Sequence, residues 1–293
     1  MTNVSKLGGL VLVDKPAGMT SHSVVGVVRR CFGTKKVGHA GTLDPMATGL
    51  LVVGVERGTK FLAHLVAETK TYEATIRLGI ETSTEDADGE VTNTTDASGV
   101  SDEDIAREVD ALTGDIMQRP SSVSAIKING KRAHQLVREG ETVEIPPRPV
   151  TIRSFDILER DGDSLRVRVH CSSGTYIRAL ARDLGHALGV GAHLTALRRL
   201  TVGPFTIAEA TPLAQLEEAP ELSLSLDEAL QACYPPLAVT DEEAQALSEG
   251  KWLAPRGVKG THVAVAPDGR SIALIKEQGK RLATVFVARP STL

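Results

Sequence analysis

The chain has 293 residues, of which 41% are hydrophobic and 24% are charged, as is usual for a globular protein. Its three cysteines are widely spaced and odd in number, which gives no disulfide framework and no CxxC metal or redox pair. No stretch of about 18 apolar residues occurs, and the first apolar run ends at Asp14 without a basic leader. We therefore expect neither a membrane span nor a signal peptide, and a cytoplasmic location.

The net charge of −4 is distributed very unevenly along the sequence. Residues 1–60 carry eight Lys/Arg against three Asp/Glu, and residues 119–199 carry fourteen against eight, so their net charges are +5 and +6. Residues 61–118 carry three Lys/Arg against fourteen Asp/Glu, so their net charge is −11. A basic face on an acidic protein can bind a polyanion in a chosen orientation. From charge alone, a solvated surface of mixed charge explains the pattern equally well.

The first predicted element is a strand at residues 10–13, and a glycine-rich loop follows at residues 38–49. Three glycines, a proline and two threonines in this loop surround one histidine and one aspartate, Asp44. Such a composition favours a backbone bent for close approach of a ligand. Taken alone, however, Asp-Pro is typical of an ordinary turn.

A strand at residues 72–78 follows, in which Tyr72, Ala74, Ile76 and Leu78 share one face, so Tyr72 is predicted to point inward. The acidic, threonine-rich segment at residues 81–98 is interpreted as an exposed connection. A helix with an acidic outer face is expected at residues 101–112.

The segment at residues 119–150 is basic and interrupted by prolines, which predicts an extended loop with a short helix near residues 133–138. Apolar residues alternate from Leu165 to Cys171 and predict a half-buried strand that leads into a Ser-Ser-Gly turn. Helical spacing begins after that turn, with Ser172 or Ser173 expected to cap the helix and Arg178 in its first turn.

The pattern changes near residues 234–236, where two prolines favour an extended connection. Short strands are expected at residues 263–266, 272–275 and 283–287, separated by Pro-Asp-Gly and Gln-Gly turns. These strands predict a compact β unit in the form of a small barrel.

Five blocks of sequence, in order, resemble the motifs of the bacterial tRNA pseudouridine synthases of the TruB family. The glycine-rich loop resembles the active-site signature, with Asp44 at the position of the catalytic aspartate. The other four blocks lie at residues 13–21, 70–72, 171–178 and 191–199. The resemblance extends from residue 10 to about residue 205.

The resemblance implies an α+β fold with a pseudouridine synthase catalytic domain on a mainly antiparallel sheet, spanning residues 1–234. Residues 119–150 would be an RNA-binding insertion within it, although His134-Gln135 stands where an aromatic-acidic pair is usual. Residues 237–293 would be a PUA-like RNA-binding β-barrel. Lys15-Pro16 is interpreted as a brace for the catalytic loop.

The implied reaction breaks the N1–C1′ bond of uridine, rotates the uracil and rejoins it through C5. This chemistry needs one carboxylate in a site that excludes water, and it needs no metal or cofactor. Asp44 is the expected nucleophile; attack at C6, attack at C1′ and a glycal route all remain open. Arg178 is the expected counter-charge of Asp44, although a lone arginine is more often solvated or paired nearby, here with Asp183.

The other expected site residues bind the extruded base. Tyr72 would stack on the uracil with its hydroxyl near C5, and His39 would support the rearranged RNA loop after base flipping. Tyr176 and Leu197 match family positions that line the uracil pocket. Judged without the family, the two tyrosines and Leu197 would pass as core residues, and His39 as a hydrogen-bonding loop residue.

The expected function is isomerisation of uridine 55 in the T loop of tRNA by a monomer with no obligatory protein partner. One alternative is a synthase of the same superfamily that acts on another RNA, or that is directed by guide RNA and protein partners. A different class of function is a tRNA-folding chaperone, in which binding and remodelling matter more than isomerisation.

Overall fold

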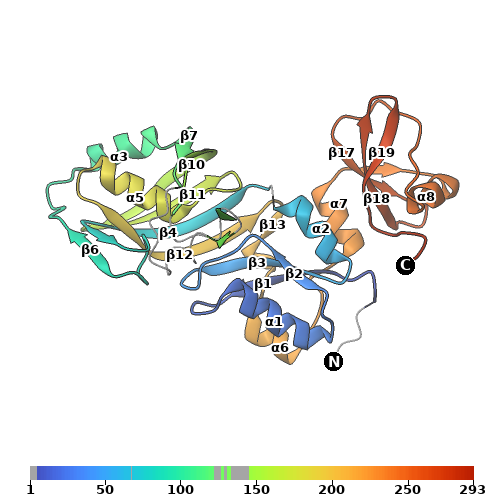
Figure 1. The fold of residues 1–293 in the computed structure, drawn as a ribbon, viewed down its shortest axis with the longest axis horizontal. Coiled ribbons are helices and arrows are strands. Elements are labelled where there is room, and N and C mark those ends of the chain that lie inside the picture. Colours follow the sequence, from blue (N-terminus) through green and yellow to red (C-terminus); the bar gives the residue numbers. More distant parts are fainter. Residues whose placement is uncertain (1–4, 67, 122–126, 129–130, 133–144) are drawn as a thin grey trace. The chain divides into compact units, whose positions relative to one another are not determined.

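A computed structural model of the chain describes residues 5–66, 68–121, 127–128, 131–132 and 145–293. The chain divides into two compact units, and each contains both helices and strands (Figure 1). Unit 1 comprises residues 1–45, 49–66 and 202–293, and unit 2 comprises residues 46–48 and 67–201. Both units combine helices with mainly antiparallel strands, so the predicted α+β class is confirmed.

The sheet of unit 1 is built around β1 (Gly9–Lys15), which covers the predicted strand. Strand β1 pairs antiparallel with β3 (Thr48–Val55), and β3 also pairs with β2 (Val37–Ala40). The other edge of β1 receives two late segments of the chain, β14 (Thr211–Pro212) in parallel and β15 (Leu224–Ser225) antiparallel. Segments about two hundred residues apart in the sequence therefore share one sheet.

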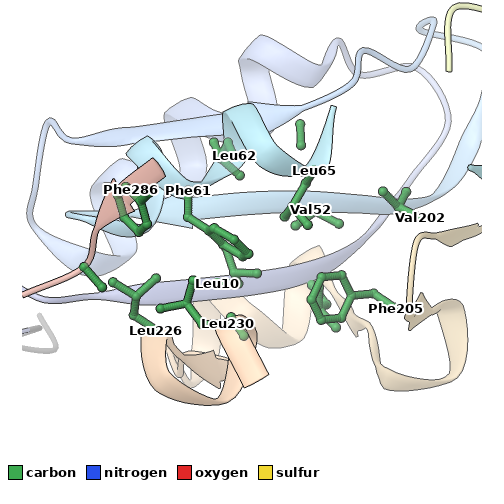
Figure 2. Packing of buried hydrophobic residues seen from close by; sticks show 14 of the residues in the cluster. Leu10, Val52, Phe61, Leu62, Leu65, Val202, Phe205, Leu226, Leu230 and Phe286 are labelled. Carbon is green, nitrogen blue, oxygen red and sulfur yellow. The ribbon is translucent and has the colours of Figure 1, made fainter. Parts of the chain in front are cut away.

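Helices cover both faces of this sheet, which explains why β1 is an unbroken apolar run. Leu10 and Leu12 face a core that includes residues of α2 (Gly58–Leu65) and α7 (Leu226–Cys233), shown in Figure 2. Val11 and Val13 face a second core with α1 (Ser21–Phe32) and α6 (Leu213–Glu218). The sequence analysis had assigned none of these helices.

The C-terminal part of unit 1 is a four-stranded sheet beside α8 (Asp241–Ser248). The strands are, in order across the sheet, β16 (Pro236–Ala238), β17 (Thr261–Val265), β18 (Ser271–Gln278) and β19 (Arg281–Val287). The three predicted strands are confirmed. Among the described residues the sheet is open, with β16 and β19 at its edges, where a barrel was expected. Strand β16 is only three residues long and begins at a proline, which has no N–H to donate.

Aromatic side chains join this sheet to the core of unit 1. The Phe286 ring lies 6.2 Å from that of Phe61 and 5.7 Å from that of His64, between ring centroids. Arg57 places its guanidinium 5.6 Å from the centre of the Phe286 ring and donates from Nε to the Val287 carbonyl at 3.1 Å. Burial lowers the pKa of His64. The predicted domain limits at residues 234 and 237 remain a prediction.

The sheet of unit 2 contains the two predicted alternating strands as neighbours. Strand β4 (Lys70–Leu78) pairs antiparallel with β11 (Ser164–Cys171), so that Tyr72 lies opposite Val169 and Ile76 opposite Leu165. Their inward faces are buried, as predicted. Within unit 2 the strand order is β12 (Ala192–Val202), β4, β11, β10 (Arg148–Asp161) and β7 (Gly114–Gln118).

Two helices, α3 (Asp102–Ala111) and α5 (Ile177–Ala187), contact each other and pack beside this sheet (Figure 1). Helix α3 confirms the prediction at residues 101–112, and Ser101 caps it by accepting from the Asp104 N–H. The expected helix at residues 133–138 lies outside the described residues. The remaining elements are β5 (Ile80–Thr82), β6 (Val91–Thr94), β8 (Lys127–Ile128), β9 (Lys131–Arg132), β13 (Phe205–Thr206) and the 3₁₀ turn Ile207–Glu209.

Candidate functional site

The expected site residues fall in both units, and each set has its own supporting contacts. His39 and Asp44 belong to unit 1. Unit 2 holds Tyr72, Tyr176, Arg178 and Leu197. The expected pairing of Asp44 with Arg178 joins residues of different units, so it remains a prediction.

Asp44 lies half-buried in the loop at residues 41–47 between β2 and β3, here called the Asp44 loop. The loop begins at Gly41, whose φ of 82° is in the left-handed region that favours glycine. The buried hydroxyl of Ser21 donates to the Leu43 carbonyl at 3.1 Å and accepts from the Leu43 N–H at 2.8 Å. One serine thereby satisfies both backbone groups of the residue just before Asp44.

The residue just after Asp44 is held as well. Lys15 is fully buried, and its ammonium donates to the carbonyls of Pro16 at 2.8 Å, Met19 at 2.7 Å and Pro45 at 3.3 Å. The Gly18 N–H also donates to the Pro45 carbonyl, at 2.8 Å. These contacts bear out the interpretation of Lys15-Pro16 as a brace, and they fix the backbone on both sides of Asp44.

In unit 2 the turn after β11 leads into α5 and brings Arg178 into the first helical turn, as predicted. The predicted serine cap is wrong, because the cap residue is Tyr176. The Ser172 hydroxyl instead accepts from the Thr151 N–H of β10 at 2.9 Å. Gln118 supports the cap residue, since its side chain accepts from the Tyr176 N–H at 2.8 Å and donates to the Tyr176 carbonyl at 3.1 Å.

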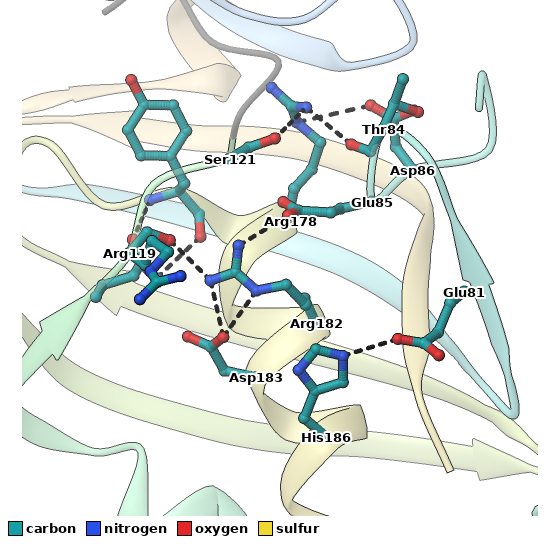
Figure 3. A network of polar contacts seen from close by, with 12 residues as sticks. Glu81, Thr84, Glu85, Asp86, Arg119, Ser121, Arg178, Arg182, Asp183 and His186 are labelled. Carbon is teal, nitrogen blue, oxygen red and sulfur yellow. Dashed lines mark hydrogen bonds and ion pairs between the residues drawn. The ribbon is translucent and has the colours of Figure 1, made fainter. Parts of the chain in front are cut away.

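Arg178 is buried, with 5% of its surface exposed, and it contacts a carboxylate that the sequence analysis missed. Its Nε lies 3.6 Å from Oδ2 of Asp86, itself only 4% exposed, as Figure 3 shows. Its Nη1 donates to the Thr84 carbonyl at 2.9 Å and to the Ser121 hydroxyl at 3.2 Å. A solvated Arg178, or one paired with Asp183, is therefore excluded. Asp86 becomes a candidate site residue.

Two further basic residues of α5 contact the same acidic segment (Figure 3). Arg182 and His186 follow Arg178 at intervals of four, so all three lie on one face of the helix. Arg182 lies 2.7 Å from Glu85, and His186 lies 2.7 Å from Glu81, measured between the polar atoms.

These pairs shift the pKa values of their members. Burial alone would lower the pKa of Arg182, but the carboxylates of Glu85 and Asp183 raise it. Hydrogen bonds from Asn93 and His186 lower the pKa of Glu81. The interpretation of residues 81–98 as an exposed connection is correct for residues 90–96 but wrong for Glu81, Glu85 and Asp86, which supply the counter-charges of α5.

The inward face of β4 carries the expected base-stacking residue next to a buried cation. Tyr72 and Lys70 are each 7% exposed, and Leu197, on the neighbouring strand β12, is also 7% exposed. Burial, with a contribution from the positive charge of Arg199, lowers the pKa of Lys70 to about 8. Burial also raises the pKa of the Cys171 thiol to about 11, so this cysteine is held as a neutral thiol.

Within the described part of the chain, no group of three or more His, Cys, Asp or Glu side chains is arranged to hold a metal ion. None of the helices described is both long enough and apolar enough to cross a membrane.

Comparison with known proteins places this geometry in a family. Residues 29–177 match the profile described as TruB family pseudouridylate synthase, N-terminal domain. Residues 178–238 match the tRNA pseudouridylate synthase B C-terminal domain, and residues 234–289 match tRNA pseudouridine synthase II, C terminal. The class of protein is therefore the pseudouridylate synthases.

Two relatives and a solved structure are similar to this chain along nearly its whole length. The tRNA pseudouridine synthase B of Corynebacterium aurimucosum is 70% identical over 297 residues, covering 100% of both chains. That of Corynebacterium glutamicum (strain R) is 68% identical over 289 residues, covering 97% of both. A crystal structure of a Cbf5–Nop10–Gar1 complex aligns with a TM-score of 0.75 at 27% identity, over 98% of this chain and 87% of that one. The chain belongs to the TruB family of pseudouridylate synthases.

Proposed function

We propose that this protein isomerises uridine to pseudouridine in tRNA, at position 55 of the T loop. The observation that carries the proposal is the 70% identity, over the whole of both chains, to a protein named tRNA pseudouridine synthase B. The contacts around Asp44 and Arg178 support it, because both residues of the family motifs are held by networks of hydrogen bonds.

In the proposed reaction Asp44 is the nucleophile on a uridine flipped out of the RNA. Fixing the backbone at Leu43 and Pro45 keeps the position of Asp44 within a narrow range, which nucleophilic catalysis needs. Arg178 pairs with Asp44 and keeps it ionised, and Tyr72 stacks on the detached uracil. His39 supports the rearranged RNA loop, and Tyr176 and Leu197 line the uracil pocket.

RNA binding is proposed for two further parts of the chain. Residues 119–150 are a basic insertion that closes over the tRNA, and residues 237–293 are a PUA-like module. No cofactor, metal or protein partner takes part in the proposed reaction, and the enzyme acts as a monomer in the cytoplasm.

The test is site-specific mapping of pseudouridine on an unmodified tRNA transcript, without added metal or cofactor. We expect the wild type to convert the T-loop uridine. Asp44→Asn should not convert it, while its tRNA affinity stays within about tenfold, because the carboxylate acts in the transition state. Turnover by Asp44→Asn would remove this residue from the mechanism.

The same experiment separates the alternatives. Binding without conversion by either protein would favour another target RNA or a tRNA-folding chaperone. A tRNA-folding chaperone would be favoured if Asp44→Asn refolded tRNA as well as the wild type and if that activity, rather than isomerisation, accounted for the biological effect.

A further inference from the structure

Residues 250–293 carry a positive net charge although the net charge of the whole chain is negative. All eight Lys and Arg residues between positions 200 and 293 lie after position 250. Against them residues 250–293 have only two acids, Asp268 and Glu277, so their net charge is +6. A short segment with this charge attracts polyanions although the protein as a whole is acidic.

The same segment exposes a large aromatic side chain. Trp252, the only tryptophan of the chain, is 53% exposed. The Arg281 guanidinium lies over its ring, 4.8 Å from the ring centre. An exposed indole beside an arginine presents two flat surfaces on which a nucleobase can stack.

Backbone pairing explains why these two side chains meet at the surface. Leu253 and Leu282 exchange both backbone hydrogen bonds, at 3.0 and 2.9 Å, and both side chains are buried in the core of the C-terminal sheet. Adjacent residues of an extended chain point to opposite faces. Trp252 and Arg281 therefore point to the outer face. Arg281 lies opposite Gln278 of β18, and the exposed Lys276 is two residues before Gln278.

The cations on this face and in the turn beside it remain available, whereas the nearby carboxylates are occupied. In the described structure Lys276, Lys280 and Arg281 have no carboxylate within ion-pair distance. Glu277 accepts from the N–H groups of Arg256, Gly257 and Val258, and Asp268 pairs with Arg270 at the opposite end of β18. Lys251, next to Trp252, is paired with Glu249 and adds little charge.

We propose that Trp252 and Arg281, with Lys276 on the same face and Lys280 next to Arg281 in the sequence, form a stacking platform for unpaired nucleotides of the RNA that carries the target uridine. An unpaired base would lie against the indole and the guanidinium, and its phosphates would meet the lysines. Phosphates and flat bases together are the chemistry of single-stranded RNA, which satisfies both features of this surface. The proposal rests on the proposed function, in that its ligand is part of the RNA substrate.

Because Trp252 is the only tryptophan, its fluorescence in the full-length protein reports on this surface alone. The probes are single-stranded octaadenylate, a blunt G·C-rich RNA duplex that stays paired at the assay temperature, and the tRNA transcript. We expect the single strand and the tRNA to quench the emission and the blunt duplex to leave it nearly unchanged. Trp252→Ala and Arg281→Ala should each weaken octaadenylate binding, measured by anisotropy of a labelled strand, by about tenfold. Arg281→Ala should also lower the salt slope by about one.

Two matched variants keep the result interpretable. Trp252→Phe retains an aromatic face and should bind within about threefold of the wild type. Arg270→Ala removes an exposed arginine that is already paired with Asp268, and its affinity should equal that of the wild type. Unchanged emission with saturating octaadenylate, equal quenching by the duplex, or equal affinities of Arg281→Ala and Arg270→Ala would each overturn the platform.

Conversion of a T-arm hairpin without free single-stranded ends is assayed in the same preparation. If the hairpin is converted but octaadenylate leaves the tryptophan emission unchanged, the platform is overturned and the proposed function stands. Quenching by the single strand without any conversion would do the reverse.

Discussion

The Asp44 loop and the start of α5 are both fixed in place, but by different forces. In the Asp44 loop, backbone groups on both sides of the aspartate bond to Ser21, Lys15 and Gly18. At α5 a row of basic side chains bonds to carboxylates of the acidic segment. The first arrangement depends on hydrogen bonds inside the core. The second depends on charge, so it should respond to charge substitution and, at its exposed end, to pH.

The largest effect is expected from Asp86→Asn, which leaves the charge of buried Arg178 without this counter-charge. Losing one partner of a buried ion pair costs about 3 to 5 kcal/mol of unfolding free energy, and we expect turnover to fall as well. Urea denaturation measures the change, with the exposed Asp88→Asn as the control that should cost less than about 0.5 kcal/mol. Equal stabilities of the two variants would mean that charge does not hold the start of α5.

Lys70 is a buried cation in unit 2, and we expect its protonated form to lower the unfolding free energy. Its pKa is lowered from 10.5 to about 8, so between these values the unfolded chain binds more protons and stability rises with pH. This contribution amounts to about 3 kcal/mol. Between pH 7.5 and 10.5 the unfolding free energy of the wild type should therefore rise by about that amount relative to that of Lys70→Met. Urea denaturation measures both values. The exposed Lys60→Met should show no such gain, and parallel pH curves for the wild type and Lys70→Met would contradict the prediction.

Ser21→Ala should have a smaller effect and act on the Asp44 loop. It leaves the buried N–H and carbonyl of Leu43 without their partner, which costs about 1 to 3 kcal/mol. Turnover should fall more than tRNA affinity, because the substitution alters the position of Asp44 and not the RNA-binding surface. The loss should be the same at low and high salt, and a loss that disappears in high salt would contradict the comparison.

The smallest effect is expected from Glu81→Gln at the exposed end of the row, below about 1 kcal/mol. The pKa of Glu81 is lowered from 4.5, so its stabilisation is complete above pH 4.5 and is lost as the pH falls through the lowered pKa. Denaturation of wild type and variant at pH 6 and pH 3 should show a smaller difference at pH 3 than at pH 6. A difference that is larger at pH 3 would show that ionisation of Glu81 is not its cause.

Sequence patterns predicted what depends on near neighbours. Alternation along residues 72–78 and 165–171 identified strands that do pair with inward faces together. The family motifs predicted Asp44 and Arg178 as site residues, which remain predictions, and the brace at Lys15 is borne out.

What the sequence did not predict depends on contacts between distant residues. The residues around Asp86 have the composition of a solvated loop. Asp86 is buried only because α5, about ninety residues later, packs against it. Ser172 was predicted to cap the helix because serine is common at helix N-caps, but its hydroxyl instead accepts a hydrogen bond from Thr151 of β10. The helices of unit 1 were missed because β1 is buried on both faces, so its sequence alone does not say what covers them.

The position of β1 in its sheet has a consequence for synthesis on the ribosome. One edge of β1 finds β3 within about forty residues, but the other edge pairs with β14 and β15, at residues 211–225. At roughly 5 to 20 residues per second, the second edge stays unpaired for about 10 to 40 seconds. During that time an apolar strand with open hydrogen-bonding groups is available to other chains. Unit 2 can finish folding in this interval, whereas unit 1 cannot close until the last third of the chain has emerged.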